Sequence, residues 1–125
     1  MQERHLVAAG AINMFIAVAA GAFGVHALKQ SLIPEMLTIW HTAATYQMIH
    51  ALGLIAIGML MPRYQTGLIK RAGITMLLGI LIFSGSLYAL AISGIRILGA
   101  ITPVGGLAFL AAWAMLAWTA LTHKS

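Results

Sequence analysis

The chain has 125 residues, of which 62% are hydrophobic and only 7% are charged. About a quarter of the residues of a soluble domain are usually charged, so this composition excludes an ordinary soluble domain and indicates an integral membrane protein. The formal net charge of +5 comes from seven scattered Lys and Arg residues rather than from one basic patch, so we expect no nucleic acid partner. Cysteine is absent from the sequence, which excludes disulfides and thiolate chemistry within it.

Four apolar stretches without Asp, Glu, Lys or Arg follow one another along the chain. Each can cross a hydrocarbon core of roughly 30 Å as a helix of about 20 residues. The sequence therefore predicts a single domain over residues 1–125, an all-α, polytopic membrane protein folded as a four-transmembrane-helix bundle. The predicted spans are residues 6–28, 42–61, 72–93 and 97–122.

Two prolines refine the helix boundaries. Pro34 suits the first turn of a helix and Glu35 suits its positive end, so we expect the second span to begin as an N-terminal extension from residue 34. One helix from Pro34 to Met61 would be about 42 Å long, which exceeds the hydrocarbon core. Pro103 is expected to kink the fourth span.

Basic residues beside the spans predict the orientation, because short loops rich in Lys and Arg stay in the cytoplasm. One side of the predicted bundle carries Arg4, Arg63, Lys70, Arg71 and Lys124, whereas the other carries Lys29 and Arg96. The imbalance favours an N-in/C-in topology, with both ends in the cytoplasm.

Small residues form a row along the first span, at Ala9, Asn13, Ala17 and Gly21. Rows with a spacing of four allow two helices to approach closely. One interpretation is a homo-oligomer that assembles through this small-residue face. The other is close packing inside one copy of the chain.

Polar side chains inside the spans gather at one depth when the spans are laid out in the predicted orientation. Polar groups are costly in lipid, so they usually face the bundle interior and often mark function. The candidate ligand-binding or polar-core residues, all in the outer half of the predicted bundle, are His26, Tyr46, Gln47, His50, Ser84, Ser86, Tyr88 and Thr102.

Three interpretations of these residues stay open. They can line a polar cavity for a small molecule, a lipid or a quinone-like ring, with His50 as the group able to titrate near neutral pH. They can be interhelical packing contacts of a structural or interaction subunit. In the third, His26 and His41 would hold a haem.

Other chemistry has little support in the sequence. His41 and His50 are too far apart on one helix to share a zinc ion, so we expect no metal site. Both acidic residues, Glu3 and Glu35, lie outside the spans, which argues against proton- or sodium-coupled transport. No nucleophile–base pair or phosphate-binding glycine loop is present, so we predict neither an enzyme nor a bound cofactor.

Four segments resemble the signature segments of one family, the YgdD-like proteins, which contain domain of unknown function 423. The segments are Gly21-Ala-Phe-Gly-Val-His-Ala-Leu28, Tyr46-Gln-Met-Ile-His-Ala-Leu52, Phe83-Ser-Gly-Ser-Leu-Tyr-Ala-Leu90 and Leu98-Gly-Ala-Ile-Thr-Pro-Val-Gly-Gly106. The resemblance covers all four predicted helices in order. It implies a small multi-pass protein of the bacterial inner (plasma) membrane, surrounded by membrane lipid, and it supplies no catalytic residues.

Overall fold

The computed structural model describes residues 2–123, which form helices joined by short turns. In chain order the helices are α1 (Glu3–Val18), the π-helix η1 (Ala19–Gly24), α2 (Val25–Leu28), α3 (Pro34–Tyr64), α4 (Gly67–Ser93), the 3-10 helix η2 (Arg96–Ala100) and α5 (Thr102–Thr122). They make up four segments long and apolar enough to cross a membrane, namely Glu3–Leu28, Pro34–Tyr64, Gly67–Ser93 and Arg96–Thr122. The predicted all-α fold with four transmembrane helices is therefore confirmed.

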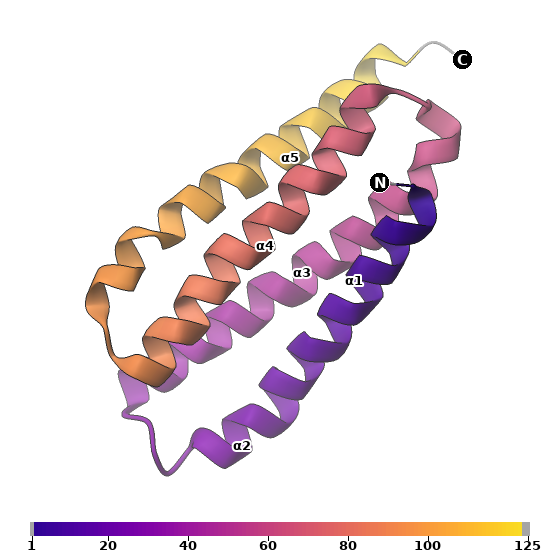
Figure 1. Cartoon of the computed structure of the whole chain (residues 1–125). Coiled ribbons are helices and arrows are strands. Elements are labelled where there is room, and N and C mark those ends of the chain that lie inside the picture. Colours follow the sequence, from indigo (N-terminus) through magenta and orange to yellow (C-terminus); the bar gives the residue numbers. More distant parts are fainter. Residues whose placement is uncertain (1, 124–125) are drawn as a thin grey trace.

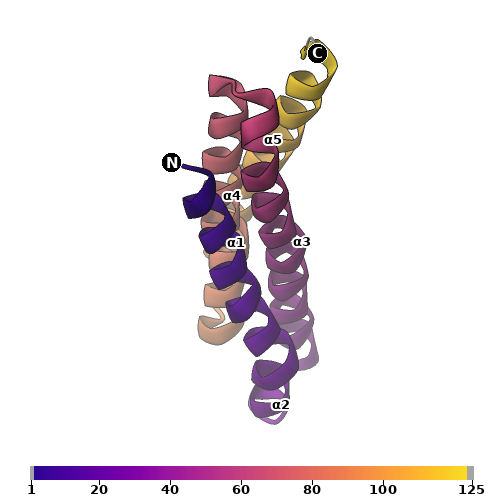
Figure 2. The same cartoon turned by 90° about the vertical axis from the view of Figure 1, so that its right-hand side faces the viewer.

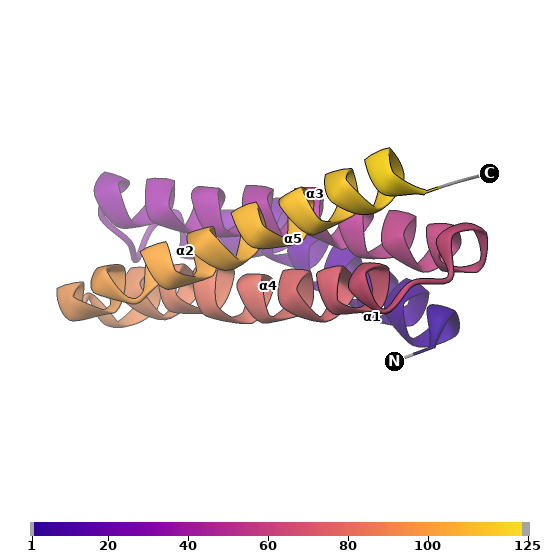
Figure 3. The same ribbon diagram turned by 90° about the horizontal axis from the view of Figure 1, so that it is seen from above.

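The helices are arranged across the molecule in chain order. α1 packs along α3, α3 along α4, and α4 along α5 (Figure 1). Both turned views place α3 and α5 on one side and α1 and α4 on the other, so the array is staggered (Figures 2 and 3). α3 and α4 are central, because 44% and 39% of their most apolar stretches are buried, against 22% and 17% for the first and fourth spans. The two flanking spans thus leave most of their surface to lipid.

Charged residues lie at the two ends of the bundle. We call the end with both termini and the α3–α4 turn the terminal end, and the opposite end the hairpin end (Figure 1). Arg4, Arg63, Lys70 and Arg71 are exposed at the terminal end, and Lys124 lies outside the described residues. At the hairpin end the Arg96 guanidinium donates to both Glu35 carboxylate oxygens, at 2.9 and 3.2 Å. This ion pair joins the start of α3 to the turn between α4 and α5.

Local signals explain where the central helices begin and end. Pro34 occupies the first turn of α3, where its missing N–H is not needed. α3 ends at Tyr64, because Gln65 adopts a left-handed conformation with φ 46°. The Thr66 hydroxyl then accepts from the Ile69 N–H at 3.2 Å and caps α4. Gly94, with φ 73°, ends α4 in the same left-handed manner.

The fourth span differs from the prediction at Pro103. The structure has a 3-10 helix over Arg96–Ala100, and α5 begins only at Thr102. Pro103 therefore lies in the first turn of α5, where its missing N–H is not needed for an α-helical hydrogen bond. It starts the α-helix and does not kink it.

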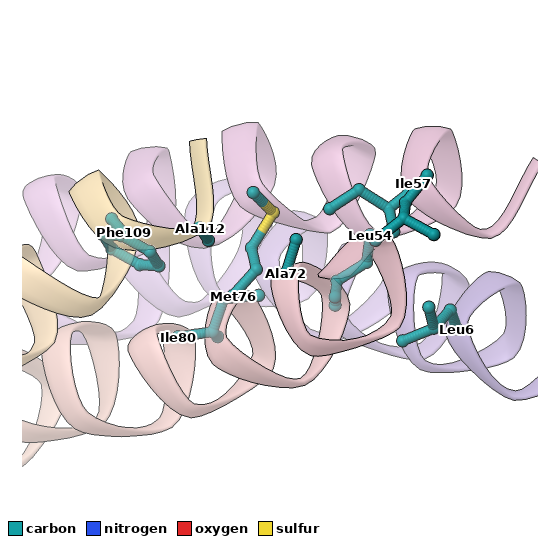
Figure 4. Close-up of a cluster of buried hydrophobic side chains, with 9 residues drawn as sticks. Leu6, Leu54, Ile57, Ala72, Met76, Ile80, Phe109 and Ala112 are labelled. Carbon is teal, nitrogen blue, oxygen red and sulfur yellow. The ribbon is translucent and has the colours of Figure 1, made fainter. Parts of the chain in front are cut away.

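Two apolar clusters surround the polar positions. The larger one joins all four spans (Figure 4) and consists of Leu6, Leu54, Ile57, Ile69, Ala72, Met76, Ile80, Phe109 and Ala112. The smaller one lies nearer the hairpin end and consists of Met36, Ala43, Leu87 and Leu90. Along α3, Gln47 and His50 fall between Ala43 of the smaller cluster and Leu54 of the larger one. Polar side chains are thus held between two apolar layers.

The small-residue face of the first span packs against α3 of the same chain. Asn13 and Ala17 are buried there, and Ala9 is half-buried. A Cβ added at Gly10 would lie 2.7 Å from the Ala51 carbonyl oxygen, so the backbones of α1 and α3 nearly touch. This contact supports the interpretation of close packing within one copy. Homo-oligomerisation through the face stays a prediction.

Candidate functional site

Four of the eight predicted polar residues lie on two different sides of α3. Gln47 and Tyr88 meet between α1, α3 and α4, whereas Tyr46 and His50 line a groove between α3 and α5. The two sides differ in chemistry, because the polar groups of the first are bonded to one another, whereas His50 Nε2 and the Tyr46 hydroxyl on the second have no hydrogen-bond partner within residues 2–123.

The first side is a chain of hydrogen bonds across three helices, which we call the Gln47 chain. The Tyr88 hydroxyl donates to Gln47 Oε1 at 2.7 Å, and Gln47 Nε2 donates to Asn13 Oδ1 at 3.0 Å. Asn13 Nδ2 then donates to the Ala9 carbonyl at 2.8 Å. The side-chain oxygens of Gln47 and Asn13 thus each accept a hydrogen bond. The Gln47 chain is therefore a closed network with little capacity for a ligand.

Trp40 connects this network to the π-helix η1. Its indole N–H donates to the Ala20 carbonyl at 2.9 Å, and its ring contacts Tyr88 edge-on, with centroids 4.7 Å apart. The Trp40 ring lies against Gly24, where an added Cβ would be 3.0 Å from Cζ2. A π-helix turn shifts the backbone bonds from the α-helical pattern, and here it brings the Ala20 carbonyl within reach of α3.

Three hydroxyl groups join α4 to its neighbours. Buried Ser84 donates to the Ala43 carbonyl of α3 at 2.8 Å. Ser86 and Thr102 share a hydrogen bond of 2.6 Å between α4 and α5. These bonds are interhelical contacts of the kind that stabilises membrane bundles by roughly 0.6 kcal/mol each.

The second side is a groove of about 540 Å³ between α3 and α5. Its walls are Tyr46 and His50 of α3 and Phe83 of α4, facing Pro103, Gly106, Leu107, Phe109, Leu110 and Trp113 of α5. Gly106 leaves room in the groove, because an added Cβ would be 3.9 Å from its nearest neighbour, the Phe83 ring. The lining is aromatic and aliphatic and includes no Asp, Glu, Lys or Arg.

His50 is the buried polar group of this groove. The residue is only 5% exposed, and its ring stacks on Phe109 with centroids 3.5 Å apart and planes 10° from parallel. Nδ1 lies 2.7 Å from the Tyr46 carbonyl oxygen, which fixes the ring rotation. Nε2 has no hydrogen-bond partner within residues 2–123, and no side-chain nitrogen or oxygen in that range is both fully buried and unpartnered. Nε2 must therefore reach a surface, and the groove is the surface that His50 lines.

Some predicted residues lie outside both sides. His26 and His41, the pair considered as haem ligands, are both exposed. His26 therefore does not join the Gln47 chain or the groove lining. Its assignment as a ligand-binding residue stays a prediction.

Sequence reasoning missed Asn13 and Trp40 as members of the polar network. Asn13 was placed in the small-residue row, although an amide in the middle of an apolar span is itself a sign of an interhelical hydrogen bond. Trp40 is not among the polar residues that the sequence predicts. No sequence signal predicts its bond to Ala20, whose carbonyl also accepts from the Val25 N–H at the end of the π-helix.

Comparison with known proteins agrees with the resemblance seen in the sequence. The family model described as a protein of unknown function (DUF423) matches residues 20–106. The chain is 45% identical to the UPF0382 membrane protein YwdK of Bacillus subtilis, over 91% of this chain and 94% of the relative. It is 48% identical to a UPF0382 membrane protein of Staphylococcus saprophyticus, over 86% and 88%. No solved structure matches the chain.

A third related protein indicates the membrane in which the chain lies. The chain is 36% identical to the UPF0382 inner membrane protein YgdD of Escherichia coli K12, over 99% of this chain and 95% of the relative. With four spans and relatives named as membrane proteins, it is a multi-pass inner-membrane protein. The chain belongs to the DUF423 family of membrane proteins, whose function is unknown.

Proposed function

We propose that this protein binds an apolar small molecule or lipid in the groove between α3 and α5. The observation that carries the proposal is the state of His50, which is 5% exposed and has an Nε2 without a partner in residues 2–123. Nε2 reaches the surface of a groove that faces hydrocarbon rather than water, where an unpaired polar atom is costly, and a ligand that bonds to it would remove this cost.

The size and lining of the groove support the same proposal. Its volume of about 540 Å³ lies within the usual range for small-molecule sites, roughly 300–1,000 Å³, which are mostly apolar with a few polar groups. Leu107 and Leu110 on its rim are 66% and 69% exposed, so a ligand can enter sideways from the bilayer.

The experiment is to look for a molecule that accompanies the protein. Native membranes would be excised as polymer-bounded discs around the wild type, Gly106→Leu and Gly85→Leu, and extracts would be compared by mass spectrometry with discs of bulk membrane. Gly106→Leu fills the groove, whereas an added Cβ at exposed Gly85 meets nothing within 4 Å, which makes it the matched control.

We expect a molecule enriched at least about tenfold with the wild type and Gly85→Leu and lost from Gly106→Leu. Enrichment that is equal in all three proteins would contradict binding in the groove. A wild-type extract that matches bulk membrane would contradict ligand binding altogether.

A structural or interaction role is the second candidate. It is favoured by the Gln47 chain, whose polar groups bond to one another and hold α1, α3 and α4 together. In this case the polar residues stabilise a bundle that presents its flanking spans to another membrane protein, and no molecule would depend on Gly106.

We also propose that both chain ends face the cytoplasm. The support is the excess of exposed Arg and Lys at the terminal end, together with the Glu35–Arg96 ion pair, which neutralises one of the cations at the hairpin end. In this orientation the groove lies in the middle and outer part of the membrane.

A further inference from the structure

The hydrogen bond between His50 and Tyr46 determines which proton the imidazole carries. A backbone carbonyl oxygen can only accept, so Nδ1, 2.7 Å away, must be the nitrogen that bears the hydrogen. In a neutral imidazole the other nitrogen, Nε2, is then a hydrogen-bond acceptor. A flip of the ring would place Cδ2 at the Tyr46 carbonyl in place of Nδ1 and lose this hydrogen bond, and the burial of the ring opposes that motion.

The groove provides no charge for an ionic ligand. Its lining residues include no Lys or Arg to pair with a phosphate or carboxylate and no Asp or Glu to pair with an amine. An ionised group would be left unpaired there, at a large cost in desolvation. The ligand that fits is therefore neutral.

We infer, on the basis of the proposed function, that the ligand carries a hydroxyl group on an apolar, preferably aromatic, body and donates its hydrogen to Nε2 of His50. Phe83, Phe109 and Trp113 provide aromatic faces for the body. The Tyr46 hydroxyl, which makes no hydrogen bond within residues 2–123, lies on the same groove and can serve a second polar atom. The geometry selects a phenol, a quinol or an alcohol over a quinone or a charged lipid headgroup.

The test uses two probes of nearly equal shape, 4-octylphenol and its methyl ether. Only the phenol can donate a hydrogen bond. Both would be titrated at equal bilayer mole fractions into nanodiscs that contain the full chain. Binding would be followed by the quenching of tryptophan fluorescence and by the 15N signal of His50 Nε2, because Trp113 and His50 both line the groove.

For the wild type we expect the phenol to bind at least about tenfold more tightly than the ether, since a site built to accept a hydrogen bond loses affinity when the donor is removed. The phenol, and not the ether, should shift the 15N signal of Nε2. In His50→Phe, which keeps the stack on Phe109 and removes the acceptor, the two probes should bind equally. Gly106→Leu should bind neither probe, and Gly85→Leu should bind like the wild type.

The outcomes separate this inference from the proposed function. If both probes bind the wild type equally and neither binds Gly106→Leu, the groove is a ligand site but the ligand needs no hydrogen-bond donor. That result would overturn this inference and keep the proposed function. If the wild type binds neither probe, or if Gly106→Leu binds them as well as the wild type does, both this inference and the proposed function are overturned. If His50→Phe does not fold, the 15N signal of the wild type decides the matter, because it requires no substitution at position 50.

Discussion

At the scale of single residues, neighbouring glycines of α5 have different tasks. A Cβ added at Gly105 would lie 2.4 Å from the Phe83 nitrogen and 2.7 Å from its Cα, so this glycine allows the backbones of α4 and α5 to meet. Gly106 faces the groove, where an added Cβ would be 3.9 Å from its nearest neighbour. One glycine is needed for helix packing, and the other keeps the groove open.

We therefore expect Gly105→Ala to lower the free energy of unfolding by about 1–3 kcal/mol, because backbone atoms must move to accept the methyl group. Gly106→Ala should change it by less than about 0.5 kcal/mol. Unfolding in mixed detergent–SDS micelles, followed by circular dichroism, measures both values. Equal losses in the two variants would show that α4 and α5 do not meet at Gly105.

At the scale of elements, the Gln47 chain links three helices through side chains that would otherwise be unpaired in lipid. Tyr88→Phe removes one bond, and Gln47→Leu removes two and leaves the Tyr88 hydroxyl and the Asn13 side-chain oxygen without their partner. Interhelical hydrogen bonds in membrane proteins contribute roughly 0.6 kcal/mol on average and about 1.7 kcal/mol at most.

A double-mutant cycle on Gln47→Leu and Tyr88→Phe should accordingly give a coupling energy of about 0.6 kcal/mol, and Gln47→Leu alone should cost roughly 1–2 kcal/mol. Ser93→Ala is the control, because within residues 2–123 this exposed hydroxyl makes only local bonds: it donates to the Ala89 carbonyl and accepts from the Ile95 N–H. Additive losses, with no coupling, would mean that Tyr88 and Gln47 do not bond in the membrane.

At the scale of the whole molecule, the charged residues divide between the two ends of the bundle and predict its orientation. A reporter enzyme that is active only in the periplasm should be inactive when fused after Thr122 and active when inserted in the turn at residues 29–33. The reverse pattern would place the termini outside. Arg4→Glu together with Arg63→Glu should weaken the preference, which can be measured as a mixed reporter signal.

Assembly into a homo-oligomer also concerns the whole molecule. The small-residue face of the first span is covered by α3, so a homo-oligomer would have to use it together with α3 or use another surface. Chemical crosslinking in native membranes, compared between the wild type and Ala17→Leu, tests that proposal. Ala17 is fully buried, so Ala17→Leu should destabilise the folded monomer. If the crosslinks persist in this variant, the small-residue face serves packing within one copy and not assembly.

Much of the fold followed from the sequence because lipid imposes simple demands. Spans of about 20 apolar residues, turns marked by Pro, Gly and charge, and the helix start at Pro34 are local properties that can be counted along the chain. The π-helix at Ala19–Gly24 and the 3-10 helix at Arg96–Ala100 were not predicted. Both depend on contacts with other parts of the chain. The π-helix holds the Ala20 carbonyl against Trp40, and the 3-10 helix precedes the first turn of α5, which contains Pro103.

The sequence by itself determined that this is a four-span membrane protein, because the length and polarity of each span can be counted along the chain. It also predicted that the polar residues gather at one depth. It could not decide which of these residues meet. Only the packing of α1 and α4 against α3 closes Gln47, Asn13 and Tyr88 into a network, and only the placement of α5 beside α3 and α4 forms the groove that His50 lines. Residues one helical turn apart thus have different roles, because rotation and spacing of helices are set by side-chain packing between distant segments.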